Sequence, residues 1–182
     1  MKICLDPGHG GRDPGAIGTV PFTLEEKEVN LSIANYLEEK LESLVHWVSM
    51  TRRRDVFVGL EARANFANRL EADLFVSLHA NSFKSPTVSG IEVLHYVNSE
   101  KGKIIAESIL TSLIASFPDH INRGVKPRRK LVVLKKTKMP AALVEVEFLS
   151  NPEQLQFLSD ENNREGLAEA IATGIENYIS SA

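Results

Sequence analysis

Short segments that favour β-strands alternate with longer segments of helical periodicity along almost the whole chain. The predicted strands are rich in Val, Leu and Ile and cover residues 2–5, 46–51, 74–79, 91–97, 131–134 and 142–148. The predicted helices have apolar residues three and four positions apart and lie within 33–44, 60–70, 105–113, 152–158 and 167–179. Such alternation predicts a largely parallel or mixed sheet with helices packed on both faces.

The composition is typical of a globular chain with one core. The 182 residues carry 21 basic and 24 acidic side chains, and no repeat, linker or low-complexity tail marks a boundary, so we expect a single domain spanning 1–182. The net charge of −3 argues against a dedicated nucleic-acid binder, and no apolar run reaches the roughly 20 residues of a membrane-spanning helix. Because Asp6-Pro7-Gly8 interrupts the first apolar stretch, we expect no signal peptide in this chain.

A histidine follows the first predicted strand in a segment built for turns. Seven glycines and prolines lie within residues 7–18, a density that requires a shaped loop. The segment lacks the spacing of a phosphate-binding loop, and it presents the imidazole of His9 instead. A second histidine, His79, ends the predicted strand 74–79, on the face shared with Phe75 and Ser77. In proteins with such sheets, ligands bind at the carboxyl ends of the strands, so the two imidazoles are candidates for one site.

Two glutamates have comparable claims to chemistry. Glu26 lies where the first predicted helix begins, and Glu145 interrupts an apolar strand, where a carboxylate is costly unless something compensates it. Two imidazoles and a carboxylate are a common ligand set for catalytic zinc, and a further carboxylate then serves as general base. The alternatives are ordinary: each histidine as a core or surface group, Glu26 as a helix-dipole partner, and Glu145 paired with a buried cation.

These residues also recur together in a known family. The chain resembles the zinc-dependent N-acetylmuramoyl-L-alanine amidases, which cleave bacterial peptidoglycan, and the likeness runs from Lys2 to about Tyr178. The matching blocks, in order, are Asp6-Pro7-Gly8-His9-Gly10-Gly11 with Asp13-Pro14-Gly15-Ala16; Glu26-Lys27-Glu28-Val29-Asn30-Leu31; Leu60-Glu61-Ala62-Arg63-Ala64-Asn65; Ser77-Leu78-His79-Ala80-Asn81; and Met139-Pro140-Ala141 with Val144-Glu145 and Phe148-Leu149-Ser150-Asn151.

The resemblance implies a fold, a cofactor and a reaction. The fold would be a three-layer αβα sandwich with a mixed, largely parallel sheet of about six strands and about five helices. His9, Glu26 and His79 would bind Zn²⁺, and Glu145 would be the catalytic base. The reaction would be hydrolysis of the amide between the lactyl group of N-acetylmuramic acid and L-alanine. Arg63 and Asn81 match family blocks and are candidate substrate contacts.

The resemblance also suggests a setting. The partner would be peptidoglycan, and the enzyme, expected to be a monomer, would act at the bacterial cell wall, either exported or released as a phage lysin. No segment between His79 and Glu145 resembles the inhibitory helix of some relatives, so we expect an open site. Basic residues concentrated between 126 and 138 are interpreted as a solvated strand pair rather than as a contact for anionic wall polymer.

One position departs from the family pattern. Relatives usually carry a small residue two positions after the catalytic glutamate, where this chain has Glu147. Residues two apart on a strand face the same way, so Glu147 would join Glu145 at the site and the two carboxylates would raise one another's pKa. The alternative, which we favour, is that the strand ends or bulges at Val146 and Glu147 reaches solvent.

Two other functions remain open at this point. A non-catalytic wall-binding module would keep the fold and bind sacculi without releasing product. A zinc peptidase acting on stem peptides would use the same ligands on a different amide, and only the product distinguishes it from an amidase.

Overall fold

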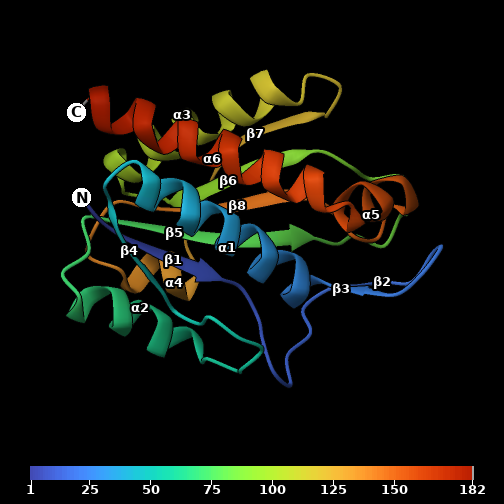
Figure 1. Ribbon diagram of the computed structural model, residues 1–182, viewed down its shortest axis with the longest axis horizontal. Helices are drawn as coiled ribbons and strands as arrows, with labels where there is room; N and C mark the ends of the chain where they lie inside the picture. The colour runs from blue at the N-terminus through green and yellow to red at the C-terminus, as the bar shows by residue number, and fades with distance from the viewer. Residues whose placement is uncertain (182) are drawn as a thin grey trace.

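A computed structural model describes residues 1–181, and its central feature is one twisted sheet with the strand order β4-β1-β5-β8-β6-β7 (Figure 1). The strands are β1 (Lys2–Pro7), β4 (Trp47–Met50), β5 (Leu74–Asn81), β6 (Ile91–Tyr96), β7 (Asn122–Arg128) and β8 (Ala141–Phe148). The four strands β4, β1, β5 and β8 are parallel, whereas β6 runs antiparallel to β8 and parallel to β7. The predicted mixed, largely parallel sheet is confirmed.

Helices cover both faces of this sheet. The helices are α1 (Glu26–Ser43), α2 (Leu60–Arg69), α3 (Glu100–Ser116), α4 (Val132–Lys136), α5 (Pro152–Ser159) and α6 (Glu161–Ser181). The larger core cluster joins the sheet to α1, α3 and α6, and a smaller cluster joins it to α2 and α4. This is the predicted αβα sandwich, with six helices in residues 1–181 instead of about five. None of them has an apolar stretch long enough to cross a bilayer.

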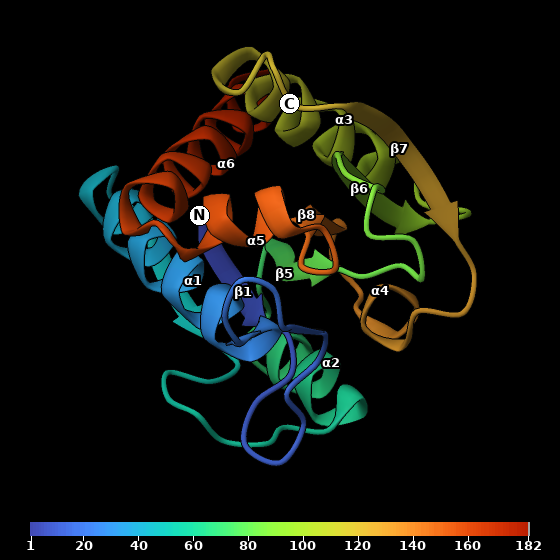
Figure 2. The ribbon, with the colours of Figure 1, turned by 90° about the vertical axis from the view of Figure 1, so that its right-hand side faces the viewer.

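The two clusters follow from the alternation of side chains along the strands. On β5, Val76 and Leu78 contribute to the larger cluster, and Phe75 contributes to the smaller one. Figure 2 looks onto the end of the sheet to which β1, β5 and β8 point, where α5 and the loops after the strands gather. A short hairpin, β2 (Ile17–Gly18) with β3 (Leu24–Glu25), also reaches this end. The loops that follow the carboxyl ends of β1, β5 and β8 therefore lie together at this end of the sheet.

One strand prediction is wrong. Residues 131–134, expected to be a strand, lie at the start of α4, and the sixth strand is β7, at the edge of the sheet. The sequence of β7, Asn-Arg-Gly-Val-Lys-Pro-Arg, is polar because an edge strand has one free side and tolerates both charge and proline. The basic residues between 126 and 138 are consequently shared by a strand, a turn and a helix, and they do not form a strand pair.

The expectation for Glu147 is also corrected. Three residues of β5, from His79 to Asn81, lie opposite four residues of β8, from Glu145 to Phe148, so β8 contains a bulge. Glu147 does not reach solvent; it is fully buried and lies 2.9 Å from His120 Nδ1. The His120 ring contacts aromatic side chains that pack on the larger core cluster, so the bulge turns Glu147 away from the face that carries Glu145.

Candidate metal centre and active site

The loop after β1 brings His9 to the carboxyl end of the sheet. His9 has φ 61°, a left-handed backbone that only a constrained loop maintains in a residue with a Cβ atom. Its neighbour Gly8 has no room for a side chain, because a Cβ there would lie 2.2 Å from Cε1 of His79. The glycines of this loop thus allow the backbone beside one imidazole to pack directly against the other.

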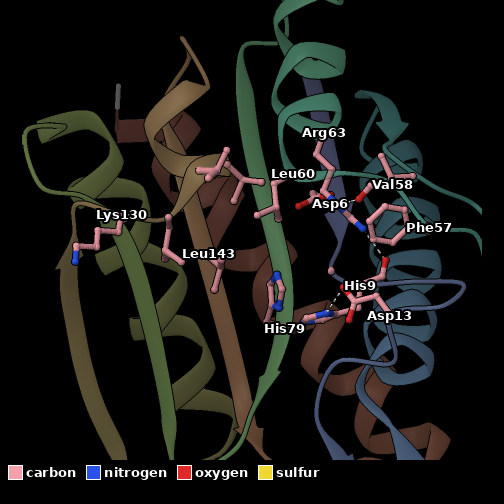
Figure 3. Close-up of a pocket in the computed structure, with 14 residues that line it drawn as sticks. Asp6, His9, Asp13, Phe57, Val58, Leu60, Arg63, His79, Lys130 and Leu143 are labelled. Atoms are coloured by element: carbon pink, nitrogen blue, oxygen red, sulfur yellow. Dashed lines mark hydrogen bonds and ion pairs between the residues drawn. The ribbon is translucent and has the colours of Figure 1, made fainter.

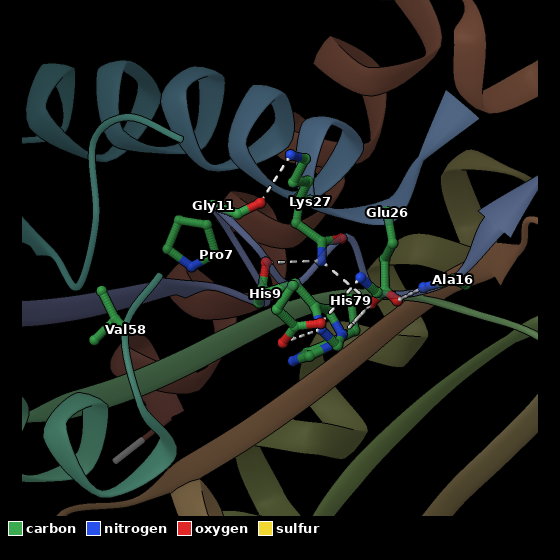
Figure 4. A network of polar contacts seen from close by, with 12 residues as sticks. Pro7, His9, Gly11, Ala16, Glu26, Lys27, Val58 and His79 are labelled. Atoms are coloured by element: carbon green, nitrogen blue, oxygen red, sulfur yellow. Dashed lines mark hydrogen bonds and ion pairs between the residues drawn. The ribbon is translucent and has the colours of Figure 1, made fainter. Parts of the chain in front are cut away.

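The predicted ligands converge. Oε1 of Glu26 lies 2.8 Å from Nδ1 of His79 and 3.2 Å from Nε2 of His9, and the two imidazole centroids are 5.0 Å apart (Figure 4). One donor atom from each of these three residues lies within 4.8 Å of the others. The second oxygen of Glu26 accepts a hydrogen bond from the backbone N–H of Ala16 at 2.8 Å. Glu26 therefore faces the histidines and is not simply a helix-dipole partner.

Asp13 belongs to the same cluster, although it is not among the residues predicted for the site. Its Oδ2 lies 2.9 Å from Nδ1 of His9, on the ring edge opposite the nitrogen that faces Glu26. A carboxylate in this position holds an imidazole in one orientation and keeps its other nitrogen available as a ligand. The i,i+4 spacing of His9 and Asp13 inside a glycine-rich loop is the signal that identifies it in retrospect.

The charges of the cluster are strongly coupled. Burial disfavours the imidazolium form of His9, but hydrogen bonds to Glu26 and Asp13 outweigh it and raise the pKa of His9 to about 9. Burial also opposes the charged form of His79, and Glu26 again prevails, so the pKa of His79 is raised. Burial works against ionisation of Glu26, yet hydrogen bonds from both imidazoles hold its pKa well below the usual range. The Glu26 carboxylate and the two imidazoles thus favour one another's charged forms.

Glu145 lies beside this cluster on β8, directly opposite His79 in the strand register. Its Oε2 is buried and has no hydrogen-bond partner in residues 1–181, so it is not paired with a buried lysine or arginine. Burial raises the pKa of Glu145 to about 7, although the positive charge of His79 opposes this. A buried, unpartnered carboxylate that takes up a proton near neutral pH has the properties of a general base.

Arg63, a predicted substrate contact, is committed to the protein interior. It is 2% exposed, and Nη1 donates to Oδ1 of Asp6 at 2.8 Å and to the carbonyl oxygen of Pro7 at 2.7 Å. Its Nη2 donates to the carbonyl oxygen of His9 at 2.6 Å. Arg52, which sequence reasoning missed, donates in the same way to the carbonyl oxygens of Pro7 and Gly8. These contacts give both arginines a role in holding the loop that carries His9.

Asn81, the other predicted substrate contact, ends β5 two residues after His79. Its side-chain oxygen accepts a hydrogen bond from the backbone N–H of Ser82 at 2.8 Å. Asn81 thus lies at the same end of the sheet as the cluster, and its described contact stabilises the turn that leaves the strand.

A cavity of about 190 Å³ opens beside the two imidazoles (Figure 3). His9 and Asp13 lie at one end and Lys130 at the other, and apolar side chains line the space between them. Those apolar side chains are Phe57, Val58, Leu60, Leu131, Val132, Val133 and Leu143. A largely apolar cavity that ends on convergent polar groups is typical of a binding site.

Comparison with known proteins gives this geometry a context. Residues 3–177 match the family model described as N-acetylmuramoyl-L-alanine amidase. The chain belongs to this amidase family. It is 37% identical over 178 residues to the N-acetylmuramoyl-L-alanine amidase LytC of Bacillus subtilis. This match covers 97% of the chain and 35% of LytC. It is 34% identical over 224 residues to the amidase AmiC of Neisseria meningitidis serogroup B. This match covers 99% of the chain and 53% of AmiC.

Solved amidase structures share the fold. The structure of the CwlD amidase from Clostridioides difficile, in complex with the GerS lipoprotein, superposes with a TM-score of 0.95 at 32% identity and covers 100% of this chain and 99% of that one. The chain spans about a third to just over half of the lengths of LytC and AmiC. The predicted family membership is thus confirmed for an amidase domain.

Proposed function

We propose that this chain is the catalytic domain of a zinc-dependent N-acetylmuramoyl-L-alanine amidase, with residues 1–182 forming one domain. Its substrate would be peptidoglycan, at the amide between the lactyl group of N-acetylmuramic acid and L-alanine, and it would act at the bacterial cell wall. The family supports the reaction class. The observation that carries the proposal is the pairing of a His9–Glu26–His79 cluster with the unpartnered carboxylate of Glu145.

The donor set fits zinc. Two imidazole nitrogens and one carboxylate oxygen are the ligand types of catalytic zinc sites. Asp13 accepts a hydrogen bond from His9, and the Ala16 N–H donates one to Glu26, so two of the three ligands are oriented. Three protein donors leave room in the coordination sphere for a reactant, as catalytic sites require. When bound, zinc would supply a Lewis acid that polarises the scissile carbonyl and makes water more acidic.

The remaining steps belong to the protein's own side chains. Oε2 of Glu145 would accept a proton from the attacking water and return it to the leaving amine nitrogen of L-alanine. Its pKa of about 7 suits both halves of this transfer, because the group binds and releases a proton near neutral pH. The apolar lining beside the imidazoles would exclude bulk water and strengthen the local electrostatic interactions.

Substitution of the base tests the proposal. Glu145→Gln should lower turnover of a defined muropeptide by about 10²–10⁴-fold while keeping bound zinc, because the amide cannot accept the proton. Glu147→Gln is the matched control on the same strand, and it should retain turnover because its side chain faces away from Glu145. EDTA should abolish cleavage and zinc should restore it, with zinc content measured on the same samples.

Product analysis decides between the proposed function and its alternatives. Mass spectrometry should show free stem peptides that begin with L-alanine and glycans that carry intact lactyl groups. Cuts between sugars or inside the stem peptide would contradict the amidase assignment. Binding of sacculi without any soluble product would instead identify a wall-binding module.

A further inference from the structure

Four cationic side chains follow the outer edge of the sheet near the proposed active site. Arg123, Lys126 and Arg128 lie on β7, and Lys130 lies in the turn before α4; we call these four residues the basic edge. Side chains of the three β7 residues are 32%, 32% and 42% exposed, respectively. They are therefore partly enclosed by the fold while still open to a ligand.

The strand register places Lys126 and Arg128 of the basic edge on the same face as Glu145. Glu92 on β6 pairs directly with Glu145 on β8, and residues paired in this way point to the same face of a sheet. One strand further out, Lys126 and Arg123 contact the carboxylate of Glu92, at 2.5 and 3.1 Å from its Oε2. Glu145, Glu92 and the basic edge thus form consecutive rows across one face.

The balance of charge in these rows is positive. Glu92 is the carboxylate that the basic edge contacts, and Arg128 approaches it at 3.9 Å. Burial opposes ionisation of Glu92, but Lys126 and Arg123 lower its pKa, so it stays charged. Lys130 has no ion-pair partner within residues 1–181. Even with Glu145 counted as charged, two carboxylates against four cations leave a local excess of positive charge.

The same cavity joins this charge to the proposed reaction centre. Lys130 lines the end of the cavity opposite His9, as Figure 3 shows. Adjacent strands lie about 4.8 Å apart, and only β6 lies between β8 and β7, so these two spacings place β7 about 10 Å from β8. An extended peptide advances by about 3.3–3.6 Å per residue, so two to three residues beyond a bond cut at Glu145 would reach the basic edge.

We propose that the basic edge binds the carboxylates of the stem peptide, in the residues that follow the L-alanine released by cleavage. This inference rests on the proposed amidase function. It attributes a preference for acidic stem peptides to the basic edge. Carboxylates suit the site because arginine and lysine donate charge-assisted hydrogen bonds to them. An anionic wall polymer is a poorer fit, because Lys130 lines the cavity in which the peptide would be cleaved.

Two matched substrates test the proposal. One is an N-acetylmuramoyl tripeptide with a free α-carboxylate on its second residue, and the other carries a carboxamide at that position. The wild-type protein should cleave the acid with a kcat/KM about five- to tenfold higher than that of the amide, mainly through KM. The double variant Arg128→Gln/Lys130→Gln should lose most of this preference. Neither substitution leaves Glu92 without cations, because Arg123 and Lys126 remain.

Controls separate a local contact from net charge. Arg69→Gln removes one cation from the far end of α2 and should keep the preference for the acid. Lys130→Glu should reverse the preference in favour of the amide, because the introduced carboxylate repels the carboxylate of the acid substrate. Each variant's circular dichroism spectrum and unfolding midpoint should match the wild type, which shows that folding is intact.

The outcomes distinguish the two proposals. Equal kcat/KM for both substrates in the wild type, or an acid preference that survives both charge variants, would overturn the basic edge and leave the amidase intact. Products cut at another bond would overturn the amidase itself. If the variants lose affinity only for sacculi that retain phosphodiester polymer, with the muropeptide preference unchanged, the basic edge is a wall-polymer contact and the peptide proposal is wrong.

Discussion

The carbonyl oxygens of residues 7–9 are held by two buried guanidinium groups, and this explains how His9 keeps a left-handed backbone. Arg63 lies in α2 and donates to the carbonyl oxygens of Pro7 and His9. Arg52 lies in the loop after β4 and donates to those of Pro7 and Gly8. A planar guanidinium presents several donors in fixed directions, so each one locks more than one carbonyl. These contacts fix the position of the loop and with it the His9 imidazole.

Loss of one of these guanidiniums should therefore cost stability and metal affinity together. Arg63→Met leaves Asp6 buried without its cation, so we expect the free energy of unfolding to fall by about 3–5 kcal/mol, measured by urea titration. Where the variant folds, isothermal titration should show zinc affinity about 10–100-fold weaker, as for other residues that orient ligands. Arg63→Lys should recover part of both quantities.

Arg69→Gln on the same helix is the control, and it should change neither quantity because Arg69 is exposed. An Arg63→Met protein that folds and binds zinc with wild-type affinity would show that the loop does not depend on this contact. The absorption spectrum of the cobalt-substituted protein adds a second readout, since a displaced His9 changes the coordination geometry.

At the scale of elements, α3 and α6 approach each other closely because a glycine lies between them. A Cβ added at Gly174 of α6 would lie 2.5 Å from the Cα of Ile109 in α3, a distance that backbone atoms cannot accommodate without a shift. Ser108 reinforces the contact by donating its hydroxyl to the carbonyl oxygen of Gly174 at 2.7 Å. The absent side chain at Gly174 thus sets the separation of two helices that cover the same face of the sheet.

The two glycines of α6 should respond oppositely to alanine. Gly174→Ala should destabilise the protein by about 1–3 kcal/mol through overpacking, measured as the free energy of unfolding in urea. Gly166→Ala is the matched control, because a Cβ there meets the ring of Phe117 at 3.2 Å and no backbone within 4 Å. Alanine favours helix by up to about 1 kcal/mol over glycine, so this variant should be neutral or more stable. Equal effects of the two substitutions would contradict the close-packing argument.

The elements also show where sequence reasoning works. The buried parallel strands and amphipathic helices were identified because their apolar periodicity records burial on each side. The edge strand β7 has no clear apolar pattern, because one of its sides is free and its polar residues face solvent or contact Glu92. For this reason it was not predicted. The apolar residues 131–134 resemble a strand because a short apolar run does not distinguish a strand from a helix. They begin a short helix whose buried face packs on α2.

The residues of the candidate site could be selected from the sequence, whereas their geometry could not. His9, His79, Glu26 and Glu145 could be selected because strand ends and a carboxylate within an apolar strand are visible in the sequence. The roles of Arg63 and Glu147 were not visible. The first depends on which carbonyls the folded loop presents, and the second on a one-residue bulge in β8. Long-range backbone contacts of this kind leave no periodic signal.

For the molecule as a whole, the ligand cluster makes the stability of the metal-free protein depend on pH. The folded pKa of His9, about 9, lies above its value in an unfolded chain, about 6.5. Its stabilising contribution is therefore fully present below pH ~6.5 and is lost as the pH rises through about 9. His79 shifts in the same direction and adds to this loss.

We expect the free energy of unfolding of the EDTA-treated protein to fall by about 1–3 kcal/mol between pH 6.5 and 8.5, measured by urea titration. His9→Gln should flatten much of this slope, because the residue then has no proton to lose. If both proteins respond to pH alike, the imidazole cluster does not govern stability in this range. Readings stop at pH 8.5 because an unfolded cysteine thiol begins to ionise there.

The single cysteine also determines how the molecule can be studied. Cys4 is fully buried in β1, and burial, with a contribution from Asp6, raises the pKa of its thiol to about 12, so the native protein offers little thiolate to a reagent. A cysteine introduced at a surface position would consequently be the one reactive thiol of the chain. Site-specific labelling therefore does not require removal of the native cysteine. A fluorophore attached beside the basic edge would report on occupancy of the cavity.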